Sequence, residues 1–408
     1  MQYHAQALAR RGADVDLIGL GGSAVHPALR DQARITLCLL PERVWAGRHG
    51  VPRPLFIAYT GARVALQSIR LLWTLLVGIR RPDIILIQNP PAVPTLVAAR
   101  LVAWLRGARL VIDWHNFGYT MLAMTLGLHH PAVRAARWYE RTAGRWADAH
   151  LCVSRAMQTE LAAHWGVQAT VLYDRPAGEF APTPAAARDA LFTRLQHVIG
   201  ISCLTGPPQA RAAVLVSPTS WTADEDFAVL LEAAAICDQR IATEVSAGGP
   251  PFPDLVVLLT GKGPLRAAYE ARLQALRLRK VHLRTLWLEP EDYPVLLGAA
   301  DLGLCLHRSS SGLDLPMKVA DMFGAGLPVA ALDYGPCLAE RVRHGENGIV
   351  FSNATELAEQ LCDLFKGFPR ECMRLDALRR RVAQQSQSRW VDGWDADALP
   401  AFLAVQEG

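Results

Sequence analysis

Short runs of apolar residues, rich in leucine and β-branched side chains, alternate with longer helical stretches along the whole chain of 408 residues. Each run has the length and composition of a strand. The runs are 14–20, 34–40, 83–88, 109–113, 149–154, 169–173, 213–217, 255–260, 281–286, 302–306, 328–332 and 348–351. Because a helix between two strands brings the second strand back parallel to the first, this order predicts α/β domains built on parallel sheets with helices on both faces.

The chain is too long for one hydrophobic core, so we expect two doubly wound domains. The first covers 1–173, a linker covers 174–211, the second covers 212–385, and a tail over 386–408 returns to the first domain. The linker contains APTPAAARDA and few residues for a core, so we expect a loose excursion. The first domain opens in a helix, 1–11, where this fold normally opens with a strand, so its first strand is expected to be missing.

Charge is distributed unevenly between the two halves. Residues 1–170 hold 19 arginines, no lysine and 9 acidic residues, whereas the remainder holds 23 basic and 29 acidic residues. This asymmetry predicts that the first domain meets an anionic partner, such as a membrane surface, a phosphorylated acceptor or nucleic acid. No nucleic-acid recognition motif is present, so nucleic acid ranks last.

Residues 54–79 form the most apolar stretch, which Arg63 and Arg70 interrupt on one helical face. No secretory signal or apolar run long enough to span a bilayer is found. Two interpretations stay open for this stretch. It is either an amphipathic helix in a membrane interface, with Trp73 on its apolar side, or a core helix packed on a sheet.

The eight cysteines are scattered and form no CxxC pair. This pattern favours neither a zinc site nor a disulfide framework, and it suits a reducing, cytosol-facing compartment. Three Asp-x-Asp strings begin at Asp14, Asp224 and Asp395, but none has a second cluster of ligands beside it. We therefore expect no metal site.

The strand at 302–306 leads into HRSSSGLDLPMKVADMFGAGLPV. Ligands of such sheets bind beyond the carboxyl ends of the strands, and a helix opening at Pro316 and stopping at Gly326 would turn its N-terminus toward a phosphate. The candidate ligand-binding residues here are His307, Ser309, Ser310, Ser311, Gly312, Asp314, Lys318 and Asp321. Lys318 would meet phosphate oxygens, while Asp314 and Asp321, seven apart, would share a face and hold hydroxyls. The alternative is that Asp314 merely caps the helix.

Two further strand ends offer candidate ligand-binding residues. Gly261 and Gly263 follow the strand at 255–260 and let the backbone approach a ligand closely, with Lys262 between them. Ser220 follows the strand at 213–217 and could contact phosphate. Asp224 and Glu225, nearby, could equally be first-turn acids of the next helix.

The strand at 109–113 ends in Asp113 and is followed by His115. Two titratable groups at the carboxyl edge of a sheet favour acid–base function. The strand at 83–88 likewise ends in a rigid polar corner, 88–91.

Six segments together resemble the chitobiosyldiphosphodolichol β-mannosyltransferase family. They are LVIDWHNFGYT, QNPP, PTSWTADEDF, LTGKGPLRAAYE, LEPEDYPVLLGAADLGLCLHRSSSGLDLPMKVADMFGAGLPV and HGENGIVF. The resemblance implies a GT-B fold, in which two Rossmann-like domains face each other across a cleft. It implies inverting transfer of mannose from GDP-mannose to GlcNAc2-diphosphodolichol, with a β-1,4 linkage, on the cytosolic face of the endoplasmic reticulum membrane. The first domain would then be the acceptor and membrane-facing domain, and the second would bind the sugar nucleotide.

The chain departs from the family pattern in two places. Family members begin with a membrane anchor, a strand and a glycine-containing loop before the segment that matches MQYHA, where this chain begins. The wider GT-B group has basic residues in the loop that here reads PTSWTADEDF, and a glutamate where Asp321 stands. The diphosphate is therefore expected to rely on Lys318, Lys262 and helix dipoles.

An inverting transfer needs a base that takes the acceptor proton. His115 or Asp113 is the candidate, and His4 competes because it would lie near the loop after the missing strand. The expected partners are GDP-mannose, dolichol-diphosphate-linked chitobiose and other mannosyltransferases of the pathway. No permanently bound cofactor is expected, and stimulation by Mg²⁺ is left open. The alternatives are another GT-B nucleotide-sugar enzyme, with a different donor or epimerase activity, and a truncated non-catalytic partner of a glycosylation complex.

Overall fold

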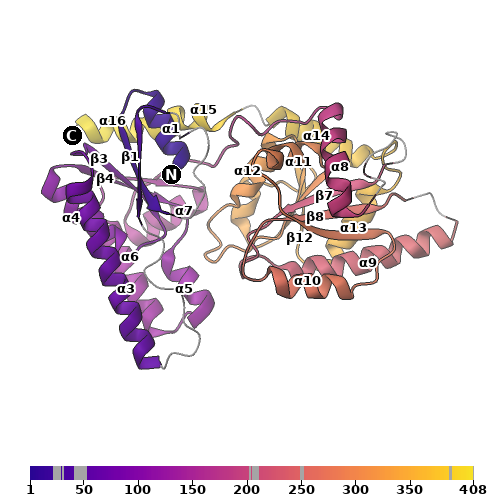
Figure 1. Ribbon diagram of the computed structural model, residues 1–408, viewed down its shortest axis with the longest axis horizontal. Helices are drawn as coiled ribbons and strands as arrows, with labels where there is room; N and C mark the ends of the chain where they lie inside the picture. Colours follow the sequence, from indigo (N-terminus) through magenta and orange to yellow (C-terminus); the bar gives the residue numbers. More distant parts are fainter. Residues whose placement is uncertain are drawn as a thin grey trace. The chain divides into compact units, whose positions relative to one another are not determined.

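The chain forms two compact units in the computed structural model (Figure 1). The structure describes residues 1–21, 29, 32–40, 53–201, 204, 211–248, 252–385 and 388–407, without the side chains of 53–61, 63, 406 and 407. Unit 1 comprises Met1–Tyr173 and Val391–Gly408, and unit 2 comprises Asp174–Trp390. The last residues of the chain therefore belong to the same unit as the first.

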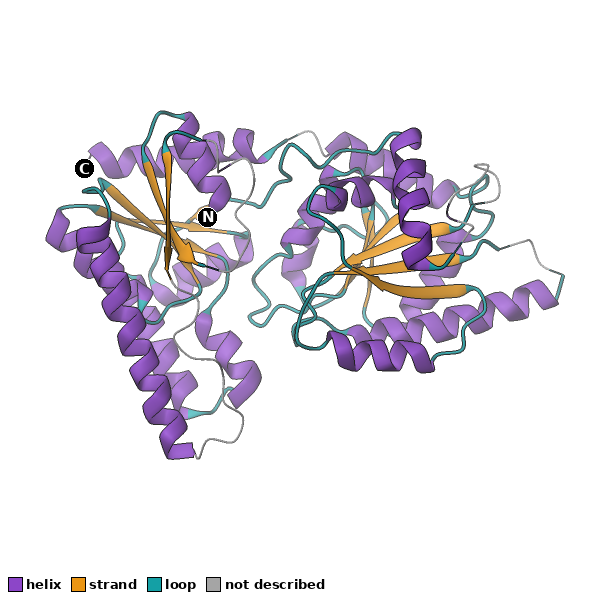
Figure 2. Cartoon of the chain, viewed as in Figure 1, coloured by secondary structure: helices purple, strands orange, loops and turns teal. Residues whose placement is uncertain are grey.

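Unit 1 is an α/β unit (Figure 2). Its strands are β1 (Val15–Leu20), β2 (Ile35–Leu40), β3 (Ile84–Asn89), β4 (Arg109–Trp114), β5 (Ala149–Cys152) and β6 (Thr170–Val171). Its helices are α1 (Gln2–Arg10), α3 (Arg53–Trp73), α4 (Thr95–Arg106), α5 (Gly118–Leu126), α6 (Pro131–Gly144) and α7 (Arg155–Glu160), with the π-helical turns η1 (Thr74–Gly78) and η2 (Leu161–Trp165). The tail adds α15 (Trp390–Gly393), the π-helical turn η5 (Trp394–Ala398) and α16 (Leu399–Glu407).

The described strands of unit 1 form two parallel sheets. One pairs β1 with β2, and the other has the order β3-β4-β5-β6. Arg80, just before β3, contacts Asp14 and Asp16 at the start of β1 with N–O distances of 3.3 Å. Every strand predicted for this half is present. The prediction that a first strand is missing stays a prediction.

The apolar stretch at 54–79 forms α3 and η1. Ile69 and Trp73 are 62% and 66% exposed, whereas Leu75 is buried. The stretch thus packs on the unit by one side and exposes apolar residues on the other, and the membrane-interface interpretation stays a prediction. The side chain of Arg63 lies outside the described part. Among the described residues, no helix combines the length and hydropathy that crossing a bilayer requires.

Unit 2 is a larger α/β unit. Its strands are β7 (Ala213–Pro218), β8 (Leu255–Thr260), β9 (Val281–Leu286), β10 (Leu302–Cys305), β11 (Val329–Leu332) and β12 (Gly348–Phe351). Its helices are α8 (Ala185–Ile199), α9 (Phe227–Ser246), α10 (Arg266–Ala275), α11 (Asp292–Ala299), α12 (Met317–Gly324), α13 (Ala354–Phe365) and α14 (Met373–Gln385), with a 3-10 turn, η4 (Pro336–Glu340). Its parallel sheet has the order β12-β11-β10-β7-β8-β9. The order reverses beside β7 and β10, which is where doubly wound sheets bind ligands.

The core of unit 2 lies between this sheet and the helices α9 and α13. Strand residues such as Leu215 and Leu304 are fully buried, because a parallel sheet covered on both faces has no solvent side. Trp221 stacks on Phe227 with ring centroids 4.6 Å apart. The aromatic pair fixes the loop after β7 to the start of α9.

The prediction of a loose excursion between the domains was wrong for residues 185–199. Residues 185–199 form α8, in which Leu191, Phe192 and Ile199 are buried. Arg188 Nε donates to the carbonyl of Ala299 at the end of α11. The alanine-rich run is a helix former, and most of its large apolar residues face the unit, while Val198 is exposed.

Candidate active site

The loops after β7 and β10 run side by side at the carboxyl edge of the unit 2 sheet. The amide of Asp226 donates to the carbonyl of Leu306 over 2.9 Å, and the amide of Arg308 donates to the carbonyl of Asp224 over 2.7 Å. These two bonds bring the segment that follows Ser220 against the segment that follows His307. Two of the three predicted donor-binding segments therefore form one surface.

His307 lies between two carboxylates. Its Nε2 is 3.1 Å from Asp314 Oδ2, and its Nδ1 is 3.5 Å from Asp224 Oδ2. Burial alone would lower the pKa of His307, but the hydrogen bonds to Asp224 and Asp314 raise it to about 9. The imidazolium is thus the stable form at neutral pH. The hydrogen bond from His307 holds the pKa of Asp224 far below its usual range.

Asp314 organises the serine loop. It accepts hydrogen bonds from the hydroxyls of Ser309 and Ser311, and the amide of Gly312 donates to Ser309 Oγ over 2.8 Å. Gly312 has a φ of +73°, the left-handed conformation that glycine adopts without strain. Ser310 lies in the same loop, without an assigned role.

Two sequence interpretations of Asp314 were wrong. The helix α12 begins at Met317 with Pro316 at its N-cap and no side-chain cap, so Asp314 is not a capping residue. Because Asp314 precedes the helix, helical spacing does not put it on one face with Asp321. Asp321 lies instead near Asp174 and Glu179, and burial, followed by those two carboxylates, raises its pKa to about 8.

Lys318, in the first turn of α12, is held by a buried carboxylate. Its Nζ donates to Glu225 Oε1 over 2.5 Å and to Ser220 Oγ over 3.4 Å. The other oxygen of Glu225 accepts from Thr219 Oγ1 over 2.5 Å and from the amide of Ser220 over 2.9 Å. Glu225 therefore orients both the lysine and the loop after β7.

The interpretation of Asp224 and Glu225 as first-turn acids of a helix was wrong. α9 begins at Phe227, and Asp226 is its N-cap, accepting from the amide of Val229. Glu225 is a site residue that sequence reasoning missed. Asp226 has the sequence pattern of an N-cap, and recognising that pattern would have placed Glu225 before the helix.

Gly261 and Gly263 allow a close approach of two loops, and their approach to a ligand stays a prediction. A Cβ on Gly261 would lie 1.8 Å from the carbonyl oxygen of Thr219, and one on Gly263 would lie 1.8 Å from that of Ser220. Only glycine fits there. Lys262, between them, places Nζ 3.8 Å from the ring centroid of Trp287, a cation–π contact.

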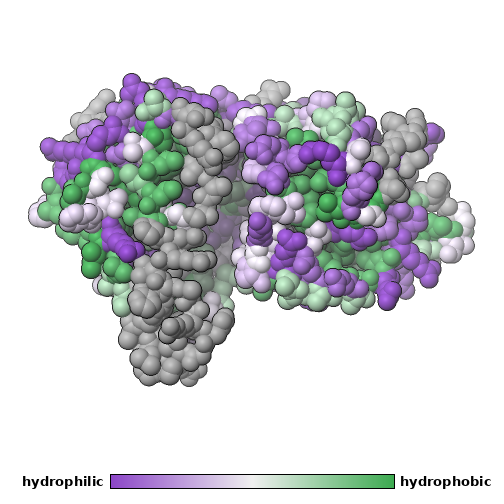
Figure 3. Space-filling view, in the orientation of Figure 1, coloured by the Kyte–Doolittle hydropathy of each residue, from purple (hydrophilic) through white to green (hydrophobic). Residues whose placement is uncertain are grey.

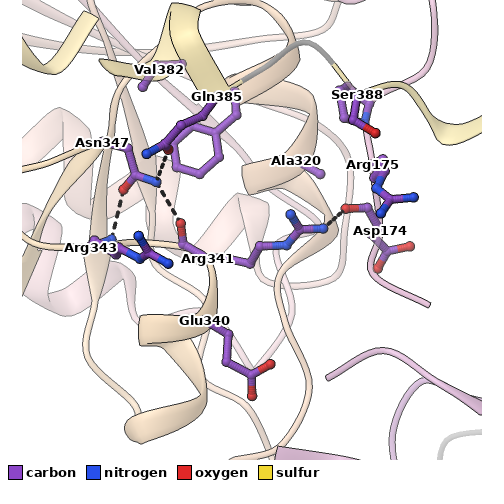
Figure 4. Close-up of a pocket in the computed structure, with 12 residues that line it drawn as sticks. Asp174, Arg175, Ala320, Glu340, Arg341, Arg343, Asn347, Val382, Gln385 and Ser388 are labelled. Atoms are coloured by element: carbon purple, nitrogen blue, oxygen red, sulfur yellow. Dashed lines mark hydrogen bonds between the residues drawn. The ribbon is translucent and has the colours of Figure 1, made fainter. Parts of the chain in front are cut away.

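A pocket of about 300 Å³ lies on another side of α12 (Figure 4). Ala320 and Phe323 face it from α12, and Arg341 reaches across to the carbonyl of Asp174. Asn347 donates to the carbonyl of Arg341 and to Gln385 Oε1, each over 2.9 Å. Among the described residues that line it, none is a predicted donor-binding residue, so the pocket is not the predicted donor site.

In unit 1, the three predicted acid–base residues converge. Asp113 Oδ2, at the end of β4, is 2.7 Å from His115 Nε2 and 3.0 Å from His4 Nε2. His4 and Asp113 are buried, whereas the side chain of His115 is 17% exposed. Burial raises the pKa of Asp113, but His115 and His4 together hold it well below its usual range, so the carboxylate is ionised.

The tautomer of His4 is set by a residue from the tail. Trp394 Nε1 donates to His4 Nδ1 over 2.9 Å, and an indole N–H can only donate. The proton of neutral His4 is therefore on Nε2, directed at Asp113. Burial lowers the pKa of His4 despite the carboxylate beside it.

A second buried acid supports the loop that carries His115. Glu140 of α6 accepts from the amides of Gly118 and Tyr119 over 2.8 and 3.1 Å, and from Asn89 Nδ2 over 2.6 Å. Asn89 Nδ2 also donates to the carbonyl of Asn116. Burial raises the pKa of Glu140. Sequence reasoning missed Glu140, which in the sequence is one acid among the arginines of an ordinary surface-like helix.

Among the described residues, no group of three or more His, Cys, Asp or Glu side chains is placed to hold a metal ion. Positively charged groups at the edge of the unit 2 sheet include Lys318, His307, Lys262 and Arg308.

Comparison with known proteins identifies both halves. Residues 1–173 match the glycosyl transferase 4-like domain, and residues 225–367 match the glycosyl transferases group 1 family. In three dimensions the chain is similar to Anabaena HepE crystallised with UDP and glucose, with a TM-score of 0.64 and 16% identity over 97% of this chain and 94% of HepE. This likeness concerns the fold, and it confirms the predicted GT-B fold class.

Curated relatives share far more of the sequence. The chitobiosyldiphosphodolichol beta-mannosyltransferase of Mus musculus is 42% identical over 432 residues, covering 100% of this chain and 86% of the mouse protein. The UDP-glycosyltransferase TURAN of Arabidopsis thaliana is 42% identical over 450 residues, covering 99% of this chain and 94% of its own length. The chain therefore belongs to the chitobiosyldiphosphodolichol β-mannosyltransferase family.

Proposed function

We propose that this chain transfers mannose from GDP-mannose to GlcNAc2-diphosphodolichol, with inversion, at the cytosolic face of the endoplasmic reticulum membrane. The observation that carries the proposal is the identity of 42% with the mouse mannosyltransferase along the whole chain. Both units contribute suitable residues: an edge with positive groups in unit 2, and in unit 1 a histidine beside the ionised Asp113.

For the donor, we assign the diphosphate to Lys318 and the N-terminus of α12. An ammonium group and the unpaired N–H groups of a first helical turn both stabilise phosphate oxygens. Glu225 holds Lys318 Nζ beside Ser220 Oγ, so the lysine is positioned before the donor arrives. The imidazolium of His307 adds a second positive charge that helps to stabilise the departing GDP.

For the acceptor, we assign the base to His115. The ionised Asp113 accepts from His115 Nε2, so the lone pair of the neutral ring is on Nδ1, which takes the proton of the attacking hydroxyl. Asp113 then stabilises the imidazolium that forms. His4 keeps Asp113 in place and acts through it, because its own Nδ1 is engaged by Trp394.

The reaction itself is tested by product mass. The protein is incubated with a GlcNAc2-diphospholipid in three separate reactions, one each with GDP-mannose, UDP-glucose and UDP-GlcNAc. We expect the added mass of one hexose with GDP-mannose alone. The name of the Arabidopsis relative supports a second candidate, a UDP-sugar donor. Product with a UDP-sugar and none with GDP-mannose would replace the proposed donor.

We also propose that transfer needs no resident cofactor, since Lys318 and His307 can supply the positive charge that stabilises the departing GDP. Activity is measured with EDTA and with added Mg²⁺. Full activity in EDTA supports the assignment of charge stabilisation to Lys318 and His307. Complete loss in EDTA, restored by Mg²⁺, would contradict it.

Two variants test the residue roles. Lys318→Ala is expected to weaken donor affinity about tenfold or more, while Lys366→Ala, which removes an exposed lysine paired with Glu244, is the matched control. His115→Ala is expected to lower kcat about 100-fold with donor affinity retained, against His164→Ala, an exposed histidine paired with Glu160. Wild-type turnover of His115→Ala would transfer the base role to Asp113 or His4.

A further inference from the structure

The helix α5 is apolar yet remains outside the core. Of its nine residues only Thr120 is buried. Met121 and Met124 are 50% and 48% exposed, and Leu128, just past the helix, is 66% exposed. A surface helix normally buries its apolar residues and turns polar ones outward, so within the described part of the chain this helix has an apolar face that is left exposed.

The neighbouring helix α6 adds an aromatic side chain and positive charge. The two helices contact each other, and they lie beyond the strands of unit 1 in Figure 1. Trp138 is 69% exposed, and Arg134, Arg137 and Arg141 are exposed as well. Arg137 lies over the ring of Tyr119, 5.5 Å from its centroid.

The same hairpin presents no negative charge. Residues 118–144 contain three arginines, no lysine, no aspartate and a single glutamate, Glu140. That glutamate is fully buried and engaged by the amides of Gly118 and Tyr119. The surface therefore combines apolar, tryptophan and arginine side chains without an exposed carboxylate.

We propose that the α5–α6 hairpin, residues 118–144, docks on the surface of a lipid bilayer. Met121, Met124, Leu126, Leu128 and Trp138 enter the boundary between headgroups and acyl chains, and the arginines meet lipid phosphates. This composition matches a membrane–water interface rather than a protein partner. Tryptophan and arginine side chains both suit the level of the lipid headgroups, and anionic lipids attract positive charge that no exposed carboxylate of the hairpin opposes.

The location of the hairpin gives the docking a role that rests on the proposed function. α5 begins three residues after His115, and the carboxylate of Glu140 fixes that junction. A bilayer under α5 would therefore keep the base close to the diphosphate headgroup of a lipid-linked acceptor.

Vesicle flotation of the full chain tests the proposal without any enzymatic readout. The probes are vesicles of phosphatidylcholine alone and of phosphatidylcholine with about one third phosphatidylserine. We expect stronger binding to the mixed vesicles. Met121→Ser/Met124→Ser/Leu128→Ser should reduce binding to both vesicles about tenfold, and Arg134→Gln/Arg141→Gln should remove the preference for phosphatidylserine.

Two sets of controls make the result specific. Val198→Ser/Met373→Ser changes two residues of unit 2 that are 67% and 84% exposed, and it should bind as the wild type does. Leu101→Ser/Trp104→Ser changes two apolar residues of α4 that are 42% and 72% exposed. This variant tests whether α4, rather than the α5–α6 hairpin, contacts the vesicle. Every substituted residue is exposed in the folded chain. The melting temperature of each variant is compared with that of the wild type.

The proposal is overturned if the wild type binds neither vesicle, if the hairpin variants bind as the wild type does, or if only the α4 variant loses binding. A separate assay distinguishes this failure from failure of the proposed function. Transfer to a short-chain, water-soluble acceptor should be unchanged in the hairpin variants, while transfer to an acceptor embedded in vesicles should fall with binding.

Discussion

The indole nitrogen of Trp394 donates a hydrogen bond to Nδ1 of His4, 390 residues earlier in the sequence. The two rings are nearly perpendicular, with centroids 6.4 Å apart, and both residues are buried. This bond fixes which nitrogen of His4 faces Asp113. The arrangement of the acid–base residues at the end of β4 thus depends on the helical segment that carries Trp394.

The first prediction concerns this bond. Trp394→Phe keeps most of the apolar volume but leaves a buried acceptor on His4 without its donor, which costs about 1–3 kcal/mol. Urea denaturation measures the loss. Trp221→Phe is the matched control, since Trp221 is equally buried and its Nε1 has no hydrogen-bond partner among the described residues. Equal losses in the two variants would show that the bond contributes nothing beyond packing.

The second prediction concerns pH and His307. The folded pKa of about 9 lies above the ordinary value of 6.5, so the stabilisation by Asp224 and Asp314 is complete below about pH 6.5 and is lost as pH rises through 9. The difference corresponds to about 3 kcal/mol. His307→Gln should therefore be less stable than the wild type near pH 6, with a gap that closes toward about pH 10.

Denaturation curves across this pH range measure the gap. His197→Gln, on the exposed side of α8, is the control and should follow the wild type at every pH. A gap for His307→Gln that stays constant with pH would contradict the assignment of a charged imidazolium.

The third prediction concerns Asp321, whose folded pKa of about 8 lies above its ordinary 3.8. The unfolded chain ionises this group first, so folded stability falls as pH rises from about 4 to 8. Asp321→Asn should therefore stabilise the protein at pH 8 by about 2 kcal/mol or more and change little at pH 4. Asp363→Asn, which alters a carboxylate that is 70% exposed, is the control for melting temperature. Because Asp321 is also a candidate for donor hydroxyls, weaker donor binding by the stabilised variant is expected. An unchanged melting temperature at pH 8 would contradict the stability assignment.

The fourth prediction concerns Gly263. A methyl group there would overlap the carbonyl of Ser220, with a Cβ–O distance of 1.8 Å, so Gly263→Ala forces the two loops apart. We expect a loss above about 3 kcal/mol, or roughly 6 °C or more in melting temperature. For Gly178→Ala nothing lies within 4 Å of the new carbon, so the melting temperature should be unchanged. Similar melting temperatures for both variants would mean that the loops tolerate separation.

Strands were the part of the fold that the sequence predicted best. Each apolar run, including the buried 255–260 and 302–306, formed a strand, because parallel strands covered on both faces need continuous apolar residues. The helix α8 was not predicted, because its alanines carry helix propensity without an apolar pattern. Its buried Leu191 and Phe192 are too few to create a periodic signal.

The site was predicted in its residues more than in its geometry. His4, Asp113 and His115 do lie together, although His4 is far from the others in the sequence. Glu225 and Glu140 were missed, because a buried glutamate and an exposed one look alike in a sequence. Their roles come from backbone amides that point at them, and only the folded chain shows where those amides are.

The return of the tail to unit 1 has a consequence during synthesis. During translation, residues 1–173 emerge from the ribosome long before residues 391–408, yet both segments belong to one unit. Trp394, which completes the surroundings of His4, emerges only after all of unit 2 has been made. The N-terminal half therefore lacks part of its own unit until residues 391–408 have been synthesised. Nascent chains halted before Trp394 should leave the first unit sensitive to protease, although every strand of its sheets is already present.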